Sequence, residues 1–236
     1  MTLLSGDGGI GKSLLAQQLL TACALGQDWL GLRTLPCPGF GLFCEDDADE
    51  LRRRQEAICR AMFATPKELT GLTLCSRVGQ ENALMSFRGE EAEGVTTDLY
   101  AQIRNAVLAS GSKLVVLDTA ADVFLGNENV RPQVRSFLNK LRAIAMEAHG
   151  AVLLTSHPSV AGASSGTGLS GSTAWNNTVR SRLYLSKNPE TGIRYLKTKK
   201  ANYGPAEGEL VLKWVNGVFS RWSAPPSWMT EDPILG

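Results

Sequence analysis

Near its start the sequence holds four glycines, a lysine and a serine in a spacing that suits phosphate binding. Residues 6–13 read GDGGIGKS and match the pattern G-x-x-x-x-G-K-[ST]. In such a loop backbone N–H groups surround the phosphates, the lysine reaches the β- and γ-phosphates, and the serine hydroxyl is a Mg²⁺ ligand. A flexible terminus is the alternative, but the apolar strand before the loop and the helix after it favour a P-loop. We therefore expect ATP and Mg²⁺ as ligands, held by Gly8, Gly9, Ile10, Gly11, Lys12, Ser13 and Leu14.

A second metal-side acid is expected at the end of a buried strand. Residues 113–118 read KLVVLD, so Asp118 follows four apolar residues typical of a central parallel strand. Ligands of such sheets gather at the carboxyl ends of the strands. An aspartate in this place can also be only a turn residue or a helix cap. Beside a P-loop, we interpret Asp118 as a Mg²⁺ ligand.

Glu45 is the candidate for the base that activates water. Asp118 is followed by Thr119 rather than by a glutamate, so this carboxylate has to come from another strand end. Residues 40–44 (FGLFC) read as an apolar strand, and Glu45 opens the acidic run EDD behind it. A carboxylate beside the γ-phosphate can orient the attacking water. The alternative is that all three acids cap the following helix; we assign that role to Asp47.

His157 follows the apolar strand of residues 151–155 and so lies at the same expected edge of the sheet. A polar side chain there can sense the γ-phosphate and transmit its presence to the loop beyond. A loop histidine without a role is the alternative.

Composition leaves room for one compact domain over residues 1–236, with residues 223–236 as an irregular tail. The 236 residues are 43% apolar and 20% charged, and the net charge is +1, which excludes a basic coat over the whole surface. No run of residues has the length and apolar character of a membrane span or an export signal, so we expect a cytoplasmic protein. Five cysteines in irregular spacing fit neither a zinc site nor a disulfide framework.

Short apolar runs alternate with helical stretches, which predicts an α/β fold with a mostly parallel sheet flanked by helices. After residue 180 the pattern changes to strands with tight turn signals, which indicates antiparallel hairpins. Two long polar stretches, 77–95 and 158–173, read as loops. The expected strands are 2–5, 40–44, 72–75, 114–117, 151–155, 181–186, 193–199, 209–215 and 217–222, and the expected helices are 12–25, 48–63, 97–109 and 131–149.

Six segments, in this order along nearly the whole chain, resemble the hexameric RepA group of replicative helicases, which are RecA-like P-loop ATPases related to the DnaB core. They read GDGGIGKS, FCEDDADELRRR, LVVLDT, TSHPS, NNTVRSRLYL and KKANYG. The last two are the more discriminating. Members of this group carry a further segment before the P-loop strand, whereas this sequence starts inside that strand. Either the start is trimmed or the contacts of that segment are missing.

The resemblance implies roles for individual residues. Lys12 and Ser13 would bind phosphate and Mg²⁺, and Asp118 would be the Walker B acid. It further implies that Glu45 is the base and that His157 senses the γ-phosphate. Arg180, in NNTVRSR, would reach the nucleotide of a neighbouring subunit, and Lys200, in KKANYG, would lie near the same interface.

Charge is unevenly distributed, which agrees with head-to-tail association. Residues 180–200 hold seven basic residues and one acid, whereas residues 81–98 hold five acids and one arginine. Lysines that merely protect an edge strand are the alternative. Residues 119–130 and 158–173 are the expected DNA-contacting loops, and neither holds a basic residue.

The sequence thus predicts an ATP-hydrolysing homo-oligomer, hexameric by resemblance, that acts as a helicase motor on single-stranded DNA. A nucleotide-switched regulatory or loader ATPase is the alternative. An inert P-loop remnant is disfavoured because every chemical position is filled.

Overall fold

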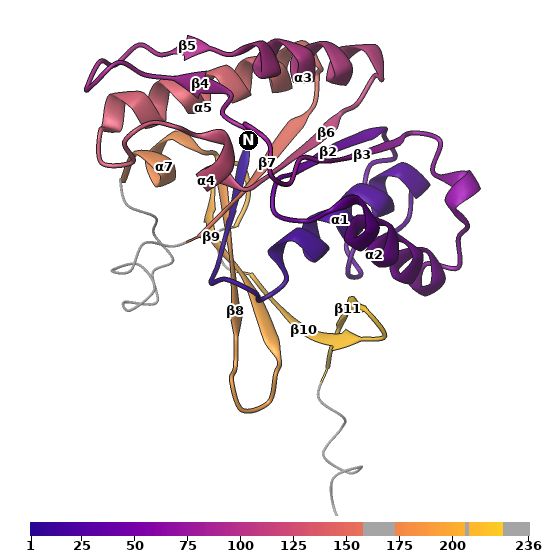
Figure 1. Cartoon of the computed structure of the whole chain (residues 1–236). Helices are drawn as coiled ribbons and strands as arrows, with labels where there is room; N and C mark the ends of the chain where they lie inside the picture. The colour runs from indigo at the N-terminus through magenta and orange to yellow at the C-terminus, as the bar shows by residue number, and fades with distance from the viewer. Residues whose placement is uncertain (158–172, 206–207, 224–236) are drawn as a thin grey trace, which may run out of the picture.

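The computed structural model describes residues 1–157, 173–205 and 208–223 (Figure 1). Within them a nine-stranded sheet has the order β11-β10-β9-β8-β1-β7-β6-β2-β3. The six strands from β8 to β3 run parallel, and β9, β10 and β11 continue the sheet antiparallel. The α/β class, the parallel centre and the C-terminal hairpins predicted from the sequence are therefore confirmed.

The parallel strands form where the sequence has short apolar runs, because both faces of each strand are covered by helices. Every residue of β2 and β6 is buried. The strands of this half are β1 (Thr2–Ser5), β2 (Gly39–Phe43), β3 (Leu72–Ser76), β6 (Leu114–Asp118), β7 (Ala151–Ser156) and β8 (Ser181–Lys187).

Helices cover the sheet in two layers (Figure 1). One core lies under α1 (Lys12–Leu25) and α2 (Ala48–Ala61) and includes Leu15, Leu20 and Ile58. The other lies under α3 (Asp98–Ala109) and α5 (Arg131–Glu147), with the short helices α4 (Ala120–Val123) and α7 (Thr173–Thr178) at its end. Together the two cores fix the sheet between α1–α2 and α3–α5.

The antiparallel strands turn back toward the start of the chain. They are β9 (Arg194–Ala201), β10 (Glu209–Val215) and β11 (Val218–Arg221), and β11 packs on both α1 and α2. Gln18 of α1 binds the backbone of Phe219 in both directions, as acceptor from its N–H (2.9 Å) and as donor to its carbonyl (3.0 Å). The C-terminal hairpin is thereby attached to the helix that follows the P-loop.

Several segments differ from the sequence-based expectations. The predicted loop 77–95 contains β4 (Met85–Ser86), which pairs with β5 (Val95–Thr96) at its end. The 3₁₀-helix η1 (Pro66–Glu68) and the short helices α4 and α7 were not predicted, and α4 lies within the expected DNA-contacting loop 119–130. Strand β9 lies between β8 and β10, so its lysines do not protect a sheet edge. Most of the loop predicted at 158–173, and the tail from residue 224, lie outside the described residues.

Candidate nucleotide site

The P-loop connects the end of β1 to the start of α1, and two of its glycines have backbone angles that side chains disfavour. Gly9 has φ +68° and Gly11, which precedes the first residue of α1, has φ +101°. A Cβ at Gly11 would also lie 2.5 Å from the Phe219 ring. Glycine at position 11 therefore satisfies both the turn and the approach of the C-terminal hairpin.

Lys12 occupies the centre of the loop. Its Nζ donates to the carbonyls of Gly6 (2.7 Å) and Asp7 (2.8 Å) and lies 3.4 Å from Nδ1 of His157. Burial lowers the pKa of Lys12, while the carboxylates of Asp118 and Glu45 act in the opposite direction. The ammonium group is therefore held over the loop, where a phosphate can replace the backbone carbonyls as its partner.

Asp118 ends β6 and is completely buried. Thr155 donates a hydrogen bond to its carboxylate and the Ser13 side chain lies close to it, yet burial raises the pKa of Asp118 to about 6. Within the described part of the chain its Oδ2 is buried and has no hydrogen-bond partner. A buried carboxylate oxygen that lacks a partner, near the Ser13 hydroxyl, fits the oxygen ligands that Mg²⁺ prefers.

Glu45 and His157 follow the ends of β2 and β7 and face each other across the loop. Oε1 of Glu45 lies 3.7 Å from Nε2 of His157, and both side chains are part-exposed. The neighbouring acids Asp46 and Asp47 bind groups of helix α2 instead. Asp47 accepts from the Glu50 N–H (2.8 Å) and caps α2 as expected, and Asp46 pairs with Arg54. Glu45 is thus the acid of this run that faces the P-loop.

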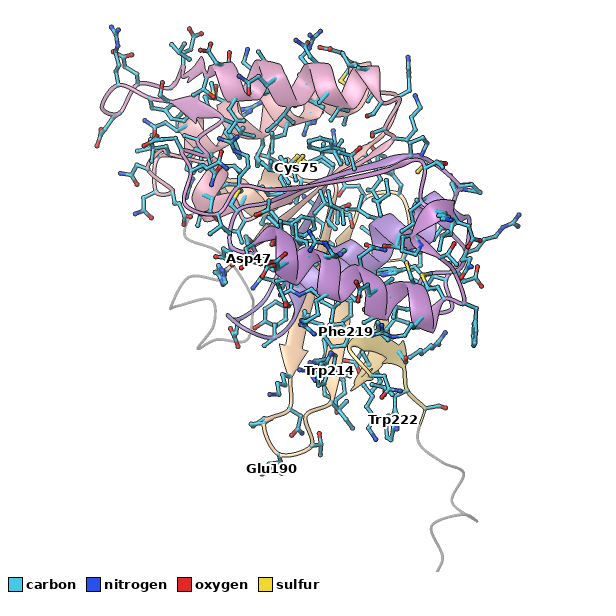
Figure 2. All side chains as sticks on the ribbon, turned by 45° about the vertical axis from the view of Figure 1, so that its right-hand side comes forward. Asp47, Cys75, Glu190, Trp214, Phe219 and Trp222 are labelled. Carbon is cyan, nitrogen blue, oxygen red and sulfur yellow. The ribbon has the colours of Figure 1, made fainter. Side chains whose placement is uncertain are left out.

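A pocket of 250 Å³ beside the P-loop contains residues that sequence analysis missed. Phe219 and Trp214 are partners in the register of β10 and β11 (Figure 2). The Arg194 guanidinium lies over the Phe219 ring (5.1 Å), and its Nε donates to the Ile10 carbonyl (3.3 Å). Aromatic and guanidinium faces of this kind can stack on a nucleobase. No local sequence signal could have found the pocket, because its walls come from opposite ends of the chain.

Arg180 and Lys200 lie near the N-terminal ends of the parallel strands, at the opposite end of the sheet from the P-loop. Arg180 directly precedes β8, and its N–H donates to the Met1 carbonyl (3.2 Å), at the start of β1. The P-loop follows the end of β1, roughly 13 Å of strand away. Lys200 donates to the carbonyls of Asn176 (2.7 Å) and Asn177 (3.4 Å) in α7. The structure therefore brings Lys12, Ser13, Glu45, Asp118 and His157 together and places Arg180 and Lys200 apart from them.

Arg180 is fixed by the segment that contains KANYG. Asn202 donates its backbone N–H to the Arg180 carbonyl (3.0 Å). The Asn202 amide, in the orientation that satisfies both of its groups, accepts from the Arg180 guanidinium (3.1 Å) and donates to the Arg180 carbonyl (3.2 Å). The guanidinium is therefore ordered away from the P-loop of its own chain.

Fold and site define a RecA-like P-loop ATPase, and comparison with known proteins agrees. Residues 1–163 match the family described as AAA domain, so the chain belongs to that family. A KaiC-like protein from the hyperthermophilic archaeon Pyrococcus horikoshii OT3 has a similar structure, with a TM-score of 0.61 and 15% sequence identity. The match covers 94% of this chain and 88% of that protein, and it supports the assignment of the fold. In the described residues no helix has the length and apolar character needed to cross a bilayer.

Proposed function

We propose that this protein hydrolyses ATP as a ring-forming motor on single-stranded DNA, as the resemblance to RepA-type helicases implies. The observation that carries the ATPase part is the meeting of four strand ends at the P-loop. They bring Ser13 to the Asp118 carboxylate, and Glu45 to within 3.7 Å of His157. No other group of described residues combines a phosphate loop, a metal-side acid and a second carboxylate at the same strand ends.

The residues divide the reaction between them. The backbone of residues 8–14 and the Lys12 ammonium would bind the β- and γ-phosphates, with the nucleoside in the pocket beside Phe219. Ser13 and the partnerless Oδ2 of Asp118 would hold Mg²⁺, which neutralises charge on the transferring phosphoryl group. Glu45 would orient the attacking water and accept its proton, while His157 would contact the γ-phosphate.

A second cation at the γ-phosphate, besides Lys12, would stabilise charge on the transferring phosphoryl group. Arg180 would not supply it within one chain, because it lies at the opposite end of β1 and β8 from the P-loop. In a head-to-tail ring that end of the strands would face the P-loop of the next subunit, where Arg180 would stabilise charge in the transition state. The proposed homo-oligomer rests on this placement. Lys200 would support the same end of the strands through its bonds to α7.

A nucleotide-switched regulator is the second candidate, and one observation favours it. The described residues 119–130 carry no basic side chain, so this expected DNA loop offers no cation to a phosphate.

Strand displacement by the purified protein separates the two candidates. A motor displaces a labelled strand only when ATP and Mg²⁺ are both present, and single-stranded DNA accelerates its ATPase. A switch shows neither effect. The mass of the protein, measured with and without ATP-Mg²⁺ and a single-stranded oligonucleotide, then reports whether a ring forms.

A further inference from the structure

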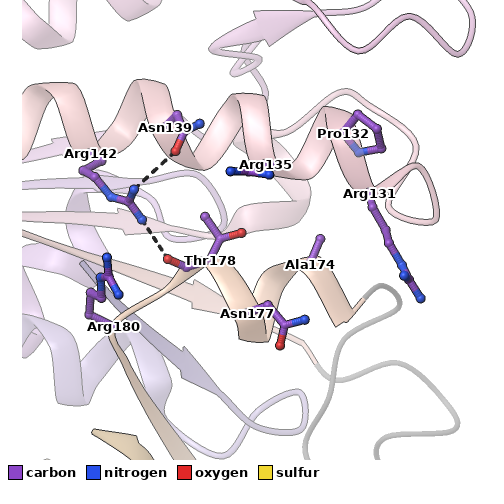
Figure 3. A pocket seen from close by; sticks show the side chains of 9 residues that line it. All are labelled: Arg131, Pro132, Arg135, Asn139, Arg142, Ala174, Asn177, Thr178 and Arg180. Carbon is purple, nitrogen blue, oxygen red and sulfur yellow. Dashed lines mark hydrogen bonds between the residues drawn. The ribbon is translucent and has the colours of Figure 1, made fainter. Parts of the chain in front are cut away.

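A basic pocket lies between α5 and α7, away from the nucleotide site (Figure 3). It has a volume of 550 Å³, and four of its nine lining residues are arginines while none is acidic. Arg131, Arg135 and Arg142 come from α5, and Arg180 follows α7. The remaining lining residues are Pro132, Asn139, Ala174, Asn177 and Thr178.

Two of these arginines, Arg131 and Arg135, have no ion-pair or hydrogen-bond partner among the described residues. Arg142 ties the helices together, because its Nη2 donates to the Thr178 carbonyl (2.8 Å) and its Nη1 to Asn139 (3.4 Å). Arg131 and Arg135 are exposed and make no ion pair or hydrogen bond with any residue of the described chain. Arg131 is also the first residue of α5, where the helix dipole disfavours a cation. An anionic ligand would neutralise the positive charge of both side chains.

The arrangement favours a chain of phosphates over a single anion or an acidic peptide. Arg131 and Arg135 lie about 6 Å apart along the helix, and Arg142 extends the row to about 16 Å. That length exceeds one phosphate group. The lining holds no aromatic or large aliphatic side chain, which a peptide would use as an anchor and a base as a stacking partner. Such a surface contacts backbone phosphates without reading sequence.

In the sequence, the helices that line the pocket directly follow the two stretches expected to touch DNA. Arg131 immediately follows residues 119–130, and α7 begins at the end of the second loop, 158–173. Helix α5 and Arg180, which follows α7, thus supply cations that both stretches lack. We propose that Arg131 and Arg135 bind the phosphate backbone of single-stranded DNA. This inference rests on the proposed motor function and supplies its missing phosphate contacts.

The test is the salt dependence of binding to a fluorescein-labelled oligodeoxythymidine, measured by anisotropy with the full chain. Each phosphate contact contributes about 0.7 to the slope of log K against log salt. Arg131→Ala/Arg135→Ala should therefore reduce the slope by about 1.4 and weaken binding about tenfold or more at low salt. Arg131→Lys/Arg135→Lys should keep most of the wild-type slope, because a phosphate contact needs the positive charge rather than the bidentate geometry of the guanidinium group.

A matched control removes two exposed cations elsewhere. Arg60→Ala/Lys67→Ala, at the end of α2 and in η1, makes the same change in net charge on the other layer of the molecule and should leave the slope unchanged. Far-UV circular dichroism checks that every variant is folded.

The outcomes separate this inference from the motor proposal. If the wild-type protein does not bind the oligonucleotide, the motor proposal fails and this site falls with it. If the wild type binds and Arg131→Ala/Arg135→Ala binds with an unchanged slope, only this inference is overturned. If the variant keeps the slope but no longer assembles with ATP-Mg²⁺, the pocket receives a neighbouring subunit, which also overturns it.

Discussion

Lys12 adds hydrogen bonds to the carbonyls of Gly6 and Asp7, but these bonds do not set the backbone turns of the loop. The positive φ values of Gly9 and Gly11 do so instead. Lys12→Ala should therefore leave the protein folded but abolish nucleotide binding or turnover. Binding of a fluorescent ATP analogue and phosphate release measure the effect, with Lys67→Ala as the control for a lost exposed lysine. Undiminished ATPase in Lys12→Ala would overturn the P-loop assignment.

Glu45 differs from its neighbours Asp46 and Asp47 because it faces His157 rather than a residue of α2. Glu45→Gln keeps the shape of the side chain but loses the base, so it should bind ATP-Mg²⁺ normally and hydrolyse it about 10²–10⁴-fold more slowly. Glu56→Gln, an exposed change on α2, is the matched control. Asp46 pairs with Arg54, and Asp46→Asn should retain most turnover. If Asp46→Asn is the slow variant instead, the wrong acid has been assigned.

Elements with a strong local pattern were predictable, and those that depend on distant contacts were not. Strands β1 and β10 have the predicted bounds, because an apolar run between turn signals defines a strand locally. Helix α7 is six residues long and polar apart from Ala174 and Trp175, and Trp175 packs edge-on against the rings of Phe124 and Phe137. Its stability therefore comes from side chains far away in the sequence.

The candidate nucleotide site also has a part that local sequence predicts and a part that depends on distant contacts. The grouping of residues 6–13 with Asp118 and Glu45 was predictable, because residues 6–13 form one contiguous motif and the two acids follow recognisable strands. The wall of the pocket beside the P-loop was not predictable, because Arg194 reaches Ile10 across 184 positions. Only the folding of β9, β10 and β11 back onto α1 places it there.

The attachment of the C-terminal hairpin to α1 makes a prediction at the scale of elements. Gln18→Leu keeps the apolar packing of α1 but leaves the N–H and carbonyl of Phe219 without their partner. A buried unsatisfied group costs about 1–3 kcal/mol, so the free energy of unfolding should fall by at least that amount. Urea unfolding followed by tryptophan fluorescence measures it. Gln102→Leu, on an exposed position of α3, should have little effect; equal loss in both variants would argue against the attachment.

At the scale of the whole molecule, the two ends of β1 have different chemistry. One end bears Glu45, Asp118 and the P-loop, and the other bears Arg180 with its guanidinium held by Asn202. Two copies stacked head to tail would bring a complete set of groups to each interface. ATP hydrolysis per subunit should therefore rise with protein concentration as copies assemble, and the molar mass measured by light scattering should rise over the same range. A constant specific activity across that range would contradict assembly as a requirement.

Mixing two inactive variants tests whether Arg180 acts between chains. Arg180→Ala should bind ATP normally but hydrolyse it poorly, since removal of an arginine finger costs about 10³–10⁵ in rate. The Arg180→Ala variant still has Glu45, and the Glu45→Gln variant still has Arg180. In a mixed ring, some interfaces pair an intact Glu45 with an intact Arg180 from the next chain, and these should restore part of the turnover. If activity does not return under conditions where subunits exchange, Arg180 acts in its own chain or has no role in hydrolysis.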